Sequence, residues 1–435
     1  MSRIRPGRTR VALAILAIGM ITVVALLFLR PAASAPAAEI LRAAATARPA
    51  GTAEALLWDA EAARAQDPDR PDAQVLVGFA ALQQARETGD PAYYSRAQAA
   101  FDAALARDAA HPDALIGAGA LALARHDFAV ALALGERAVA AAPFTARAYG
   151  LVADAQIELG EYDAATGSLQ KMVDLRPDLS AYSRIAYIRE LYGDVPGAIS
   201  AMQQAVAAGG PVLENTEWTR VQLGNLYAGS GDLVAAERIY NEALFYIDGY
   251  VPALVGLARI RAAQGNTTEA FTLYQAALQR LPLAEYAIAY GELLEASGQE
   301  DAAQQQYDLV RAIQQLQRSS GVDVDLELAL FEADHGDPQA ALAMARNAYE
   351  RRPGIRGAEA LAWAAFRTGD LEQAQLRITE ALRLGTRDAV LLYRAGAIAA
   401  ARGDADTARR QYTEALAINP EFSPLFAPLA RQAST

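Results

Sequence analysis

The residues most able to do chemistry gather between positions 323 and 337. The group contains six carboxylates and one histidine: Asp323, Asp325, Glu327, Glu332, Asp334, His335 and Asp337. Carboxylate oxygens and an imidazole could together hold a divalent cation. However, Asp323, Glu327 and Asp334 recur at i, i+4 and i+11 of one expected helix, a spacing typical of acidic side chains that face water. Asp337 can also cap the helix that follows. We therefore predict a solvated acidic face here, and not a metal site.

The sequence lacks the residues that other common catalytic sites require. The chain has three histidines and no cysteine, which removes most nucleophile–base pairs, all disulfides and thiolate metal sites. His111 and His126 fall in expected turns between helices, where we predict structural roles. No Gly-x-Ser-x-Gly elbow, P-loop, zincin pair or dinucleotide fingerprint occurs in the sequence. The sequence therefore predicts a non-enzymatic protein without a cofactor.

The overall charge excludes one class of partner. The net charge is −12, although the first thirty residues contain five arginines and no acidic residue. Without those five arginines the chain has 34 basic and 51 acidic residues, a net charge of −17. A surface of this sign repels phosphate backbones, so we expect no nucleic-acid partner.

The elements that position these residues come from an internal repeat. Within residues 217–282 the same residue types recur at an offset of 34: Leu223, Gly224, Gly231, Ala236, Tyr240 and Ala243 correspond to Leu257, Ala258, Gly265, Ala270, Tyr274 and Ala277. A fixed period of this length marks a helix–turn–helix repeat. Each copy carries two apolar stripes at i, i+3, i+4 and i+7 spacing, which indicates two amphipathic helices.

Small and turn-forming residues define the geometry of one copy. Gly224 and Ala236 lack bulk, so the two helices can approach closely, with Tyr240 filling the space beside the contact. Gly231 tolerates the left-handed conformation that ends the first helix, and Asp232 can cap the second. One such hairpin cannot bury its apolar faces alone, so the copies must stack.

An alanine register extends this pattern along most of the chain. The expected second helices carry Ala97, Ala131, Ala165, Ala198, Ala236, Ala270, Ala303, Ala341, Ala374 and Ala408. The pattern is similar to the tetratricopeptide repeat family. We therefore predict an all-α solenoid with about ten repeats over residues 71–420, followed by a C-terminal capping helix within residues 421–435.

Departures from the register mark irregular places in the expected stack. The first repeat has an extra segment between its helices at residues 86–94, and Gly209-Gly210-Pro211 predicts a bend between two halves. A long second helix is expected from Ala303 to about Arg318. Residues 422–433 are expected to form the closing helix. Residues 30–70 are expected to form a linker with two degenerate helices, near 39–47 and 54–66.

Several short segments of the sequence resemble those of a group of uncharacterised, exported bacterial tetratricopeptide proteins. They are Gln84-Ala85-Arg86, Asp90-Pro91, residues 324–330, Ala333-Asp334-His335-Gly336 and Gly385-Thr386-Arg387-Asp388. This resemblance implies no known chemistry. The family's clamp for peptide carboxylates is absent, because Val221 and Gly256 occupy the places of its lysine and asparagine beside Asn225.

The N-terminal segment predicts the location of the protein. Residues 11–29 form an uncharged run close to the ~20 residues needed to span a bilayer. Four arginines precede it, so we predict a cytoplasmic basic segment at residues 1–10 and repeats on the extracytoplasmic side. The alternative is a signal peptide cleaved near Ala33-Ser34-Ala35, which would release a secreted protein.

The family resemblance also predicts where a partner would bind. The first helices of such arrays line a concave face, and the resemblance places Asp154, Tyr187, Glu190, Trp218, Asn225, Arg259, Glu292, Trp363 and Arg367 on it. Exposed aromatic and arginine side chains there would suit a binding surface. Trp218 and Trp363 could instead pack between repeats. We predict a membrane-anchored adaptor for an unknown protein or peptide; the alternatives are a structural subunit of a membrane complex, or an enzyme that uses the acidic cluster.

Overall fold

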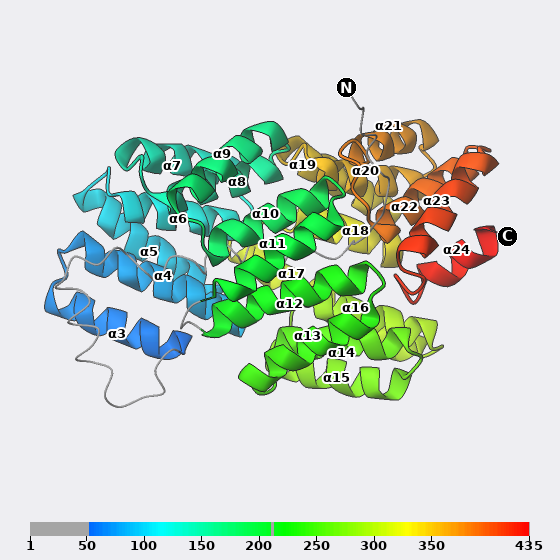
Figure 1. Cartoon of the computed structure of the whole chain (residues 1–435), viewed down its shortest axis with the longest axis horizontal. Helices are drawn as coiled ribbons and strands as arrows, with labels where there is room; N and C mark the ends of the chain where they lie inside the picture. The colour runs from blue at the N-terminus through cyan, green and yellow to red at the C-terminus, as the bar shows by residue number, and fades with distance from the viewer. Residues whose placement is uncertain (1–51, 210–212, 435) are drawn as a thin grey trace, which may run out of the picture.

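The computed structural model describes residues 52–209 and 213–434, which form twenty-two helices and no strand (Figure 1). Ten pairs of consecutive helices form antiparallel hairpins: α4 (Pro71–Thr88) with α5 (Ala92–Arg107), α6 (Pro112–Ala124) with α7 (Phe128–Ala141), α8 (Ala146–Glu158) with α9 (Tyr162–Leu175), α10 (Leu179–Leu191) with α11 (Val195–Ala207), α12 (Leu213–Gly229) with α13 (Leu233–Tyr246), α14 (Val251–Ala263) with α15 (Thr267–Arg280), α16 (Ala284–Ala296) with α17 (Glu300–Ser319), α18 (Asp325–His335) with α19 (Pro338–Arg351), α20 (Ile355–Arg367) with α21 (Leu371–Ala381), and α22 (Ala389–Ala401) with α23 (Ala405–Ile418). The single helices α3 (Ala53–Gln66) and α24 (Phe426–Ser434) flank them. The prediction of an all-α helical stack is confirmed.

Parts of the predicted organisation fall outside the described residues. These are the membrane-spanning run at 11–29, the weak helix at 39–47 and most of the bend at Gly209-Gly210-Pro211. Within the described ranges, no helix is both long enough and apolar enough to cross a bilayer. The location predicted from the N-terminal segment therefore remains a prediction.

Two local predictions need correction. The segment 86–94 is not an insertion between helices, because α4 continues through Arg86 to Thr88 before Gly89 ends it in a left-handed conformation, with φ of 68°. The closing helix begins at Phe426 and not at position 422, because the Ser423 hydroxyl accepts hydrogen bonds from the backbone N–H groups of Leu425 and Phe426. The long second helix is confirmed as α17.

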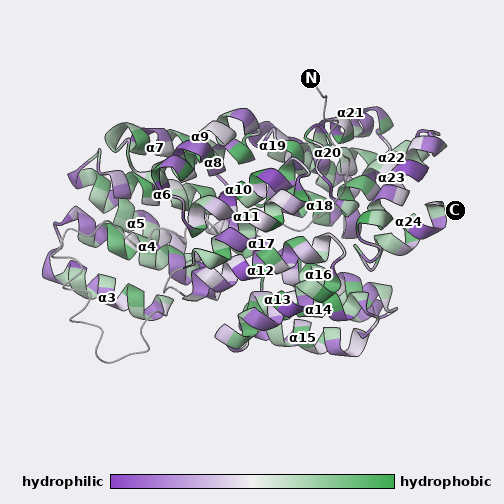
Figure 2. Ribbon diagram, in the orientation of Figure 1, coloured by the Kyte–Doolittle hydropathy of each residue, from purple (hydrophilic) through white to green (hydrophobic). Residues whose placement is uncertain are grey.

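The turn within a repeat forms as its residues require. Gly231 has φ of 77°, and the Asp232 side chain accepts a hydrogen bond from Ala235 N at the start of α13. The Tyr240 ring lies against Gly224 of its own repeat and Gly256 of the next one, where any Cβ would come within about 2.5 Å of the ring. Hydrophobic and hydrophilic residues share each helix, and the apolar ones pack between neighbouring helices (Figure 2).

The repeats wind into two superhelical turns, five repeats in each, and these stack directly on one another. Within each of the first five repeats, the short turn between the two helices contacts a loop of the second superhelical turn. That loop follows the repeat five places further along the chain. Gly89 lies against Leu281, Arg125 O accepts from Asp323 N, Tyr162 Oη accepts from Ile355 N, Leu191 O accepts from Thr386 Oγ1, and Ala228 O accepts from Asn419 Nδ2. We call these five contacts the inter-turn seam.

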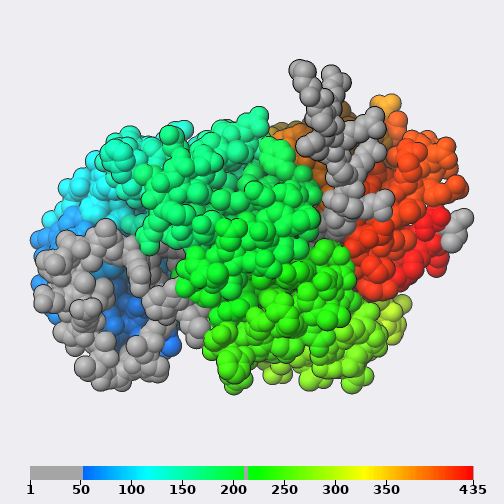
Figure 3. Space-filling model, in the orientation of Figure 1, coloured from blue at the N-terminus to red at the C-terminus, as the bar shows by residue number. Residues whose placement is uncertain are grey.

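The seam brings together residues far apart in the sequence. Its three side-chain hydrogen bonds join residues separated by 193, 195 and 191 positions. In Figure 1, α19 accordingly lies beside α8 and α9, and the space-filling view shows teal and green segments in contact with orange ones (Figure 3). The first helices of the repeats therefore line a common interior of the superhelix.

Candidate functional site

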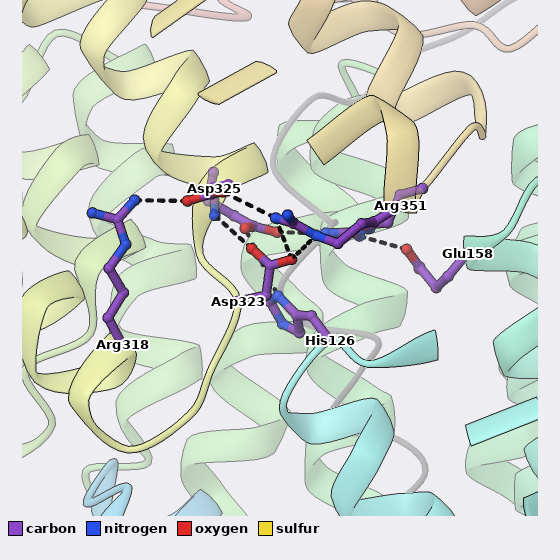
Figure 4. Close-up of polar contacts among 8 residues, drawn as sticks. His126, Glu158, Arg318, Asp323, Asp325 and Arg351 are labelled. Atoms are coloured by element: carbon purple, nitrogen blue, oxygen red, sulfur yellow. Dashed lines mark hydrogen bonds and ion pairs between the residues drawn. The ribbon is translucent and has the colours of Figure 1, made fainter. Parts of the chain in front are cut away.

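The acidic residues at the start of α18 are paired with arginines and are only partly exposed. Arg351 bonds to both Asp323 and Asp325, at 2.7–2.9 Å, and Arg318 bonds to Asp325 at 2.7 Å (Figure 4). The side chains of Asp323 and Asp325 are only 22% and 19% exposed. The predicted acidic face therefore keeps some contact with water at these positions, but the arginines of α17 and α19 neutralise it, which the sequence did not predict.

Glu327 faces the seam and not solvent. Its carboxylate accepts a hydrogen bond from Arg352, which also pairs with Glu158 of the first turn and stacks on the Phe128 ring at 4.6 Å. His126 Nδ1 lies 3.8 Å from the same carboxylate. Burial would raise the pKa of Glu327, but His126 and Arg352 bring it below its ordinary value. This buried network ties the two turns together.

The remaining acidic residues of the cluster also have dedicated partners. Glu332 bonds to Arg311, and His335 lies 3.4 Å from Glu292. Asp337 caps α19, as predicted, by accepting from Gln339 N. Across residues 52–209 and 213–434, no three histidine or acidic side chains are arranged to hold a metal ion. The cluster therefore acts as a set of structural ion pairs.

Two adjoining cavities occupy the interior of the superhelix. The smaller has a volume of about 310 Å³ and the larger about 410 Å³. Both are lined by Asn225, Arg259, Glu285 and Glu327, which we call the neck. The smaller cavity extends toward α18 and α22, and the larger extends toward α4 and α12.

Four of the nine residues predicted to lie on the concave face line these cavities. Asn225 and Arg259 belong to the neck, Trp218 lines the larger cavity, and Glu292 lines the smaller one. Asn225 is held in place because its Oδ1 accepts from Tyr240 Oη at 2.7 Å and its amide donates to Gln222. The family resemblance therefore pointed to the interior through these four residues.

The structure places the other predicted residues elsewhere. Tyr187 and Glu190 are buried beside the seam, and burial raises the pKa of Glu190 to about 7 although the Arg356 charge opposes this. Asp154 forms a buried ion pair with Arg184 at 2.7 Å, away from both cavities. These three side chains therefore contribute to packing in this structure.

Trp363 and Arg367 meet at Asp334. The Trp363 indole is 2% exposed, donates from Nε1 to Asp334 at 2.7 Å and packs on Phe366 and Phe426. Arg367 reaches the same carboxylate at 3.4 Å. For Trp363, packing between repeats is therefore the interpretation that the contacts favour.

Several residues of the interior were not singled out from the sequence. In the larger cavity, Glu214 accepts from both Arg86 and Tyr250 Oη, and Glu285 completes the neck. Arg86 and Glu214 lie 128 positions apart, so no local spacing connects them. In the sequence, Arg86 stands out only through the unusual length of the first repeat and through the segment Gln84-Ala85-Arg86, and neither indicates a contact with Glu214.

The fold and this interior define a helical-repeat scaffold. The chain matches the tetratricopeptide repeat family over residues 93–146, 221–285 and 359–422, and through a second description of the same repeat over residues 146–179. The chain is therefore a tetratricopeptide repeat protein, and such proteins are generally non-enzymatic scaffolds for protein–protein interactions.

Solved structures share this fold at low sequence identity. The human IFIT1 dimer with m7Gppp-AAAA is 16% identical, with a TM-score of 0.50 over 86% of this chain and 92% of that chain. A tetratricopeptide repeat protein from Parabacteroides merdae is 18% identical, with a TM-score of 0.33 over 59% of this chain and 97% of that one. No curated protein is similar enough to the chain to count as a relative. The likeness to the human IFIT1 dimer concerns the fold alone.

Proposed function

We propose that this protein is a non-enzymatic adaptor that binds a short segment of a partner protein inside its superhelix. The observation that carries the proposal is the pair of cavities that meet at the neck. Their volumes, about 310 and 410 Å³, fall in the range of pockets that hold small ligands. A folded domain cannot enter such a space, so the partner presents a chain end or an extended segment.

The location forms part of the same proposal. The uncharged run at 11–29, preceded by arginines, supports a membrane anchor that holds the repeats on the extracytoplasmic side. A cleaved signal peptide would place the same repeats in the same compartment without the anchor. An adaptor held at the membrane would collect partner segments close to the bilayer, as envelope assembly requires.

An exposed apolar group supports a second candidate, a structural subunit of a membrane complex. On α13, Val234 is 81% exposed, Phe245 83% and Tyr246 51%. Apolar side chains gathered on one outer helix are typical of a contact between proteins. In that case the partner would cover α13, and the interior cavities would play no part in binding.

Site-specific photocrosslinking in cells separates the two functions. A photoreactive phenylalanine derivative replaces Ile288, which lines the smaller cavity, or Phe245 on the outer face. We expect one discrete partner adduct from position 288. Trp218→Ala should reduce that adduct, because truncating a buried aromatic anchor typically costs ~2 kcal/mol or more of binding. Adducts from position 245 alone would refute the adaptor and support the subunit.

A matched variant controls for the fold. Phe245→Ala removes an aromatic ring of the outer face that makes few contacts with the stack, so it should leave the adduct from position 288 unchanged. Both alanine variants must retain the helical circular dichroism and the melting temperature of the parent protein. An adduct that survives Trp218→Ala but disappears in Phe245→Ala would also contradict binding in the interior.

A further inference from the structure

The neck holds two charged side chains that have no ion-pair partner. Arg259 comes from α14 and Glu285 from α16, and both line both cavities. Within the described ranges, neither side chain has an opposite charge within 4.0 Å, and Arg259 Nε has no hydrogen-bond acceptor. The Arg259 guanidinium lies against the Tyr274 hydroxyl instead. An arginine and a glutamate therefore face one space without forming a pair.

Other interior arginines show how unusual this arrangement is. Arg352 bonds to Glu158 and Glu327, and Arg394 bonds to Glu359 at 2.7 Å. Removing a charge from water without a partner costs several kcal/mol, which is why buried charges are normally paired. Arg259 and Glu285 are only partly exposed and lack an ion-pair partner, so both are available to a ligand and offer it one positive and one negative group.

We propose that the neck is a subsite for a zwitterionic group, with a ligand carboxylate bound by Arg259 and a ligand ammonium or guanidinium bound by Glu285. The proposal rests on the interior being the binding surface of the adaptor. A ligand with both charges compensates both side chains at once, whereas a ligand with one charge leaves the other side chain unpaired. Asn225 lines the neck together with Arg259 and Glu285. Its amide group is held by hydrogen bonds to Tyr240 and Gln222, so it offers polar contacts in a fixed position.

The protonation of Glu285 is consistent with this assignment. Burial raises the pKa of the Glu285 carboxyl to about 7, although the Arg259 charge acts in the opposite direction. The titratable groups that interact with this carboxyl are Arg259 from α14 and Tyr286 on α16 itself. A ligand cation next to Glu285 would favour the ionised carboxylate, so a proton would be released when the ligand binds.

Calorimetry with defined probes tests the subsite on the whole chain. The probes are the twenty free amino acids, each compared with its Nα-acetyl derivative, which lacks the α-ammonium, and its α-amide, which lacks the α-carboxylate. A blocked tetrapeptide, acetyl-Gly-Lys-Glu-Gly-amide, carries both charges on side chains. We expect at least one free amino acid or the tetrapeptide to bind, and a free amino acid that binds should do so at least tenfold more tightly than either of its derivatives. Binding of the tetrapeptide alone would identify a partner segment, and not a free amino acid, as the source of the group.

Two neutral variants assign each charge to its residue. Arg259→Gln should remove the preference for the zwitterion over the amide, and Glu285→Gln should remove the preference over the N-acetyl derivative. Arg280→Gln is the control, because Arg280 lines the larger cavity but donates to Gly249 O. Equal affinities for a zwitterion and its derivatives, or no binding by any probe, would overturn the subsite. If the adduct from position 288 persists in that case, the subsite fails and the adaptor function stands.

Discussion

Arg352→Ala should lower the free energy of unfolding by about 3–5 kcal/mol, because it leaves two carboxylates buried without their cation. The Arg352 side chain is 3% exposed and lies between Glu158 of the first turn and Glu327 of the second. It also covers the ring of Phe128. Loss of this one side chain therefore weakens both the charge balance and the packing of the seam. Chemical denaturation followed by circular dichroism measures the change.

The preceding residue provides the control. Arg351 also bonds to two carboxylates, Asp323 and Asp325, but its side chain is 50% exposed. Pairs that remain in contact with water contribute little, so Arg351→Ala should cost less than about 1 kcal/mol. Combining Arg352→Met with Glu158→Gln and Glu327→Gln removes all three charges and should recover much of the lost stability. Equal costs for Arg351→Ala and Arg352→Ala would contradict a buried seam.

Gly193→Ala should destabilise the protein by about 3 kcal/mol or more, from two separate causes. Gly193 has φ of 73°, a conformation that costs an L-residue about 1–2 kcal/mol. In addition, a Cβ at this position would lie 2.3 Å from Gly385 O, a backbone atom of the second turn that cannot move aside as a side chain could. The two turns would have to separate locally to make room.

Gly369→Ala isolates the first of these causes. Gly369 occupies the equivalent turn of the ninth repeat, with φ of 85°, but a Cβ there would meet nothing within 4 Å. This variant should cost only about 1–2 kcal/mol for its backbone conformation. The difference in melting temperature between the two variants therefore measures the contact across the seam. Identical melting temperatures would show that Gly193 does not touch the second turn.

Features set by neighbouring residues were predictable from the sequence. The left-handed Gly231, the capping Asp232 and the contact of Gly224 with Tyr240 all lie within one repeat, so the 34-residue pattern contains them. The same holds for the long helix α17, because its apolar stripe continues without a break. Local spacing determines these features through the helical period and the backbone freedom of glycine.

The seam and the neck could not be predicted in the same way. The superhelical pitch decides which loop of the second superhelical turn contacts which repeat of the first. This pitch is the sum of small rotations between successive repeats. For this reason Asp323 and Glu327 looked solvated, although the cations that cover them follow about one repeat later and Glu158 lies a full turn away. The segment Gly385-Thr386-Arg387-Asp388 carries a family resemblance in the sequence, but no local spacing indicates that Thr386 bonds to Leu191 across the seam.

The repeats form two stacked superhelical turns around a common interior, and crosslinking tests this arrangement most directly. The chain has no cysteine, so Glu161→Cys with Pro353→Cys introduces the only thiols. Both positions are exposed. Pro353 itself contacts Gly160, and Glu161 is the next residue after Gly160. A short bis-maleimide should join them within one chain, giving faster migration on a denaturing gel and a linked peptide pair by mass spectrometry. Glu161→Cys with Leu376→Cys, which places the second thiol on the outer surface of α21, should remain unlinked. If the first pair stays unlinked in folded protein while both thiols react with a monofunctional maleimide, the two superhelical turns are apart and do not share an interior.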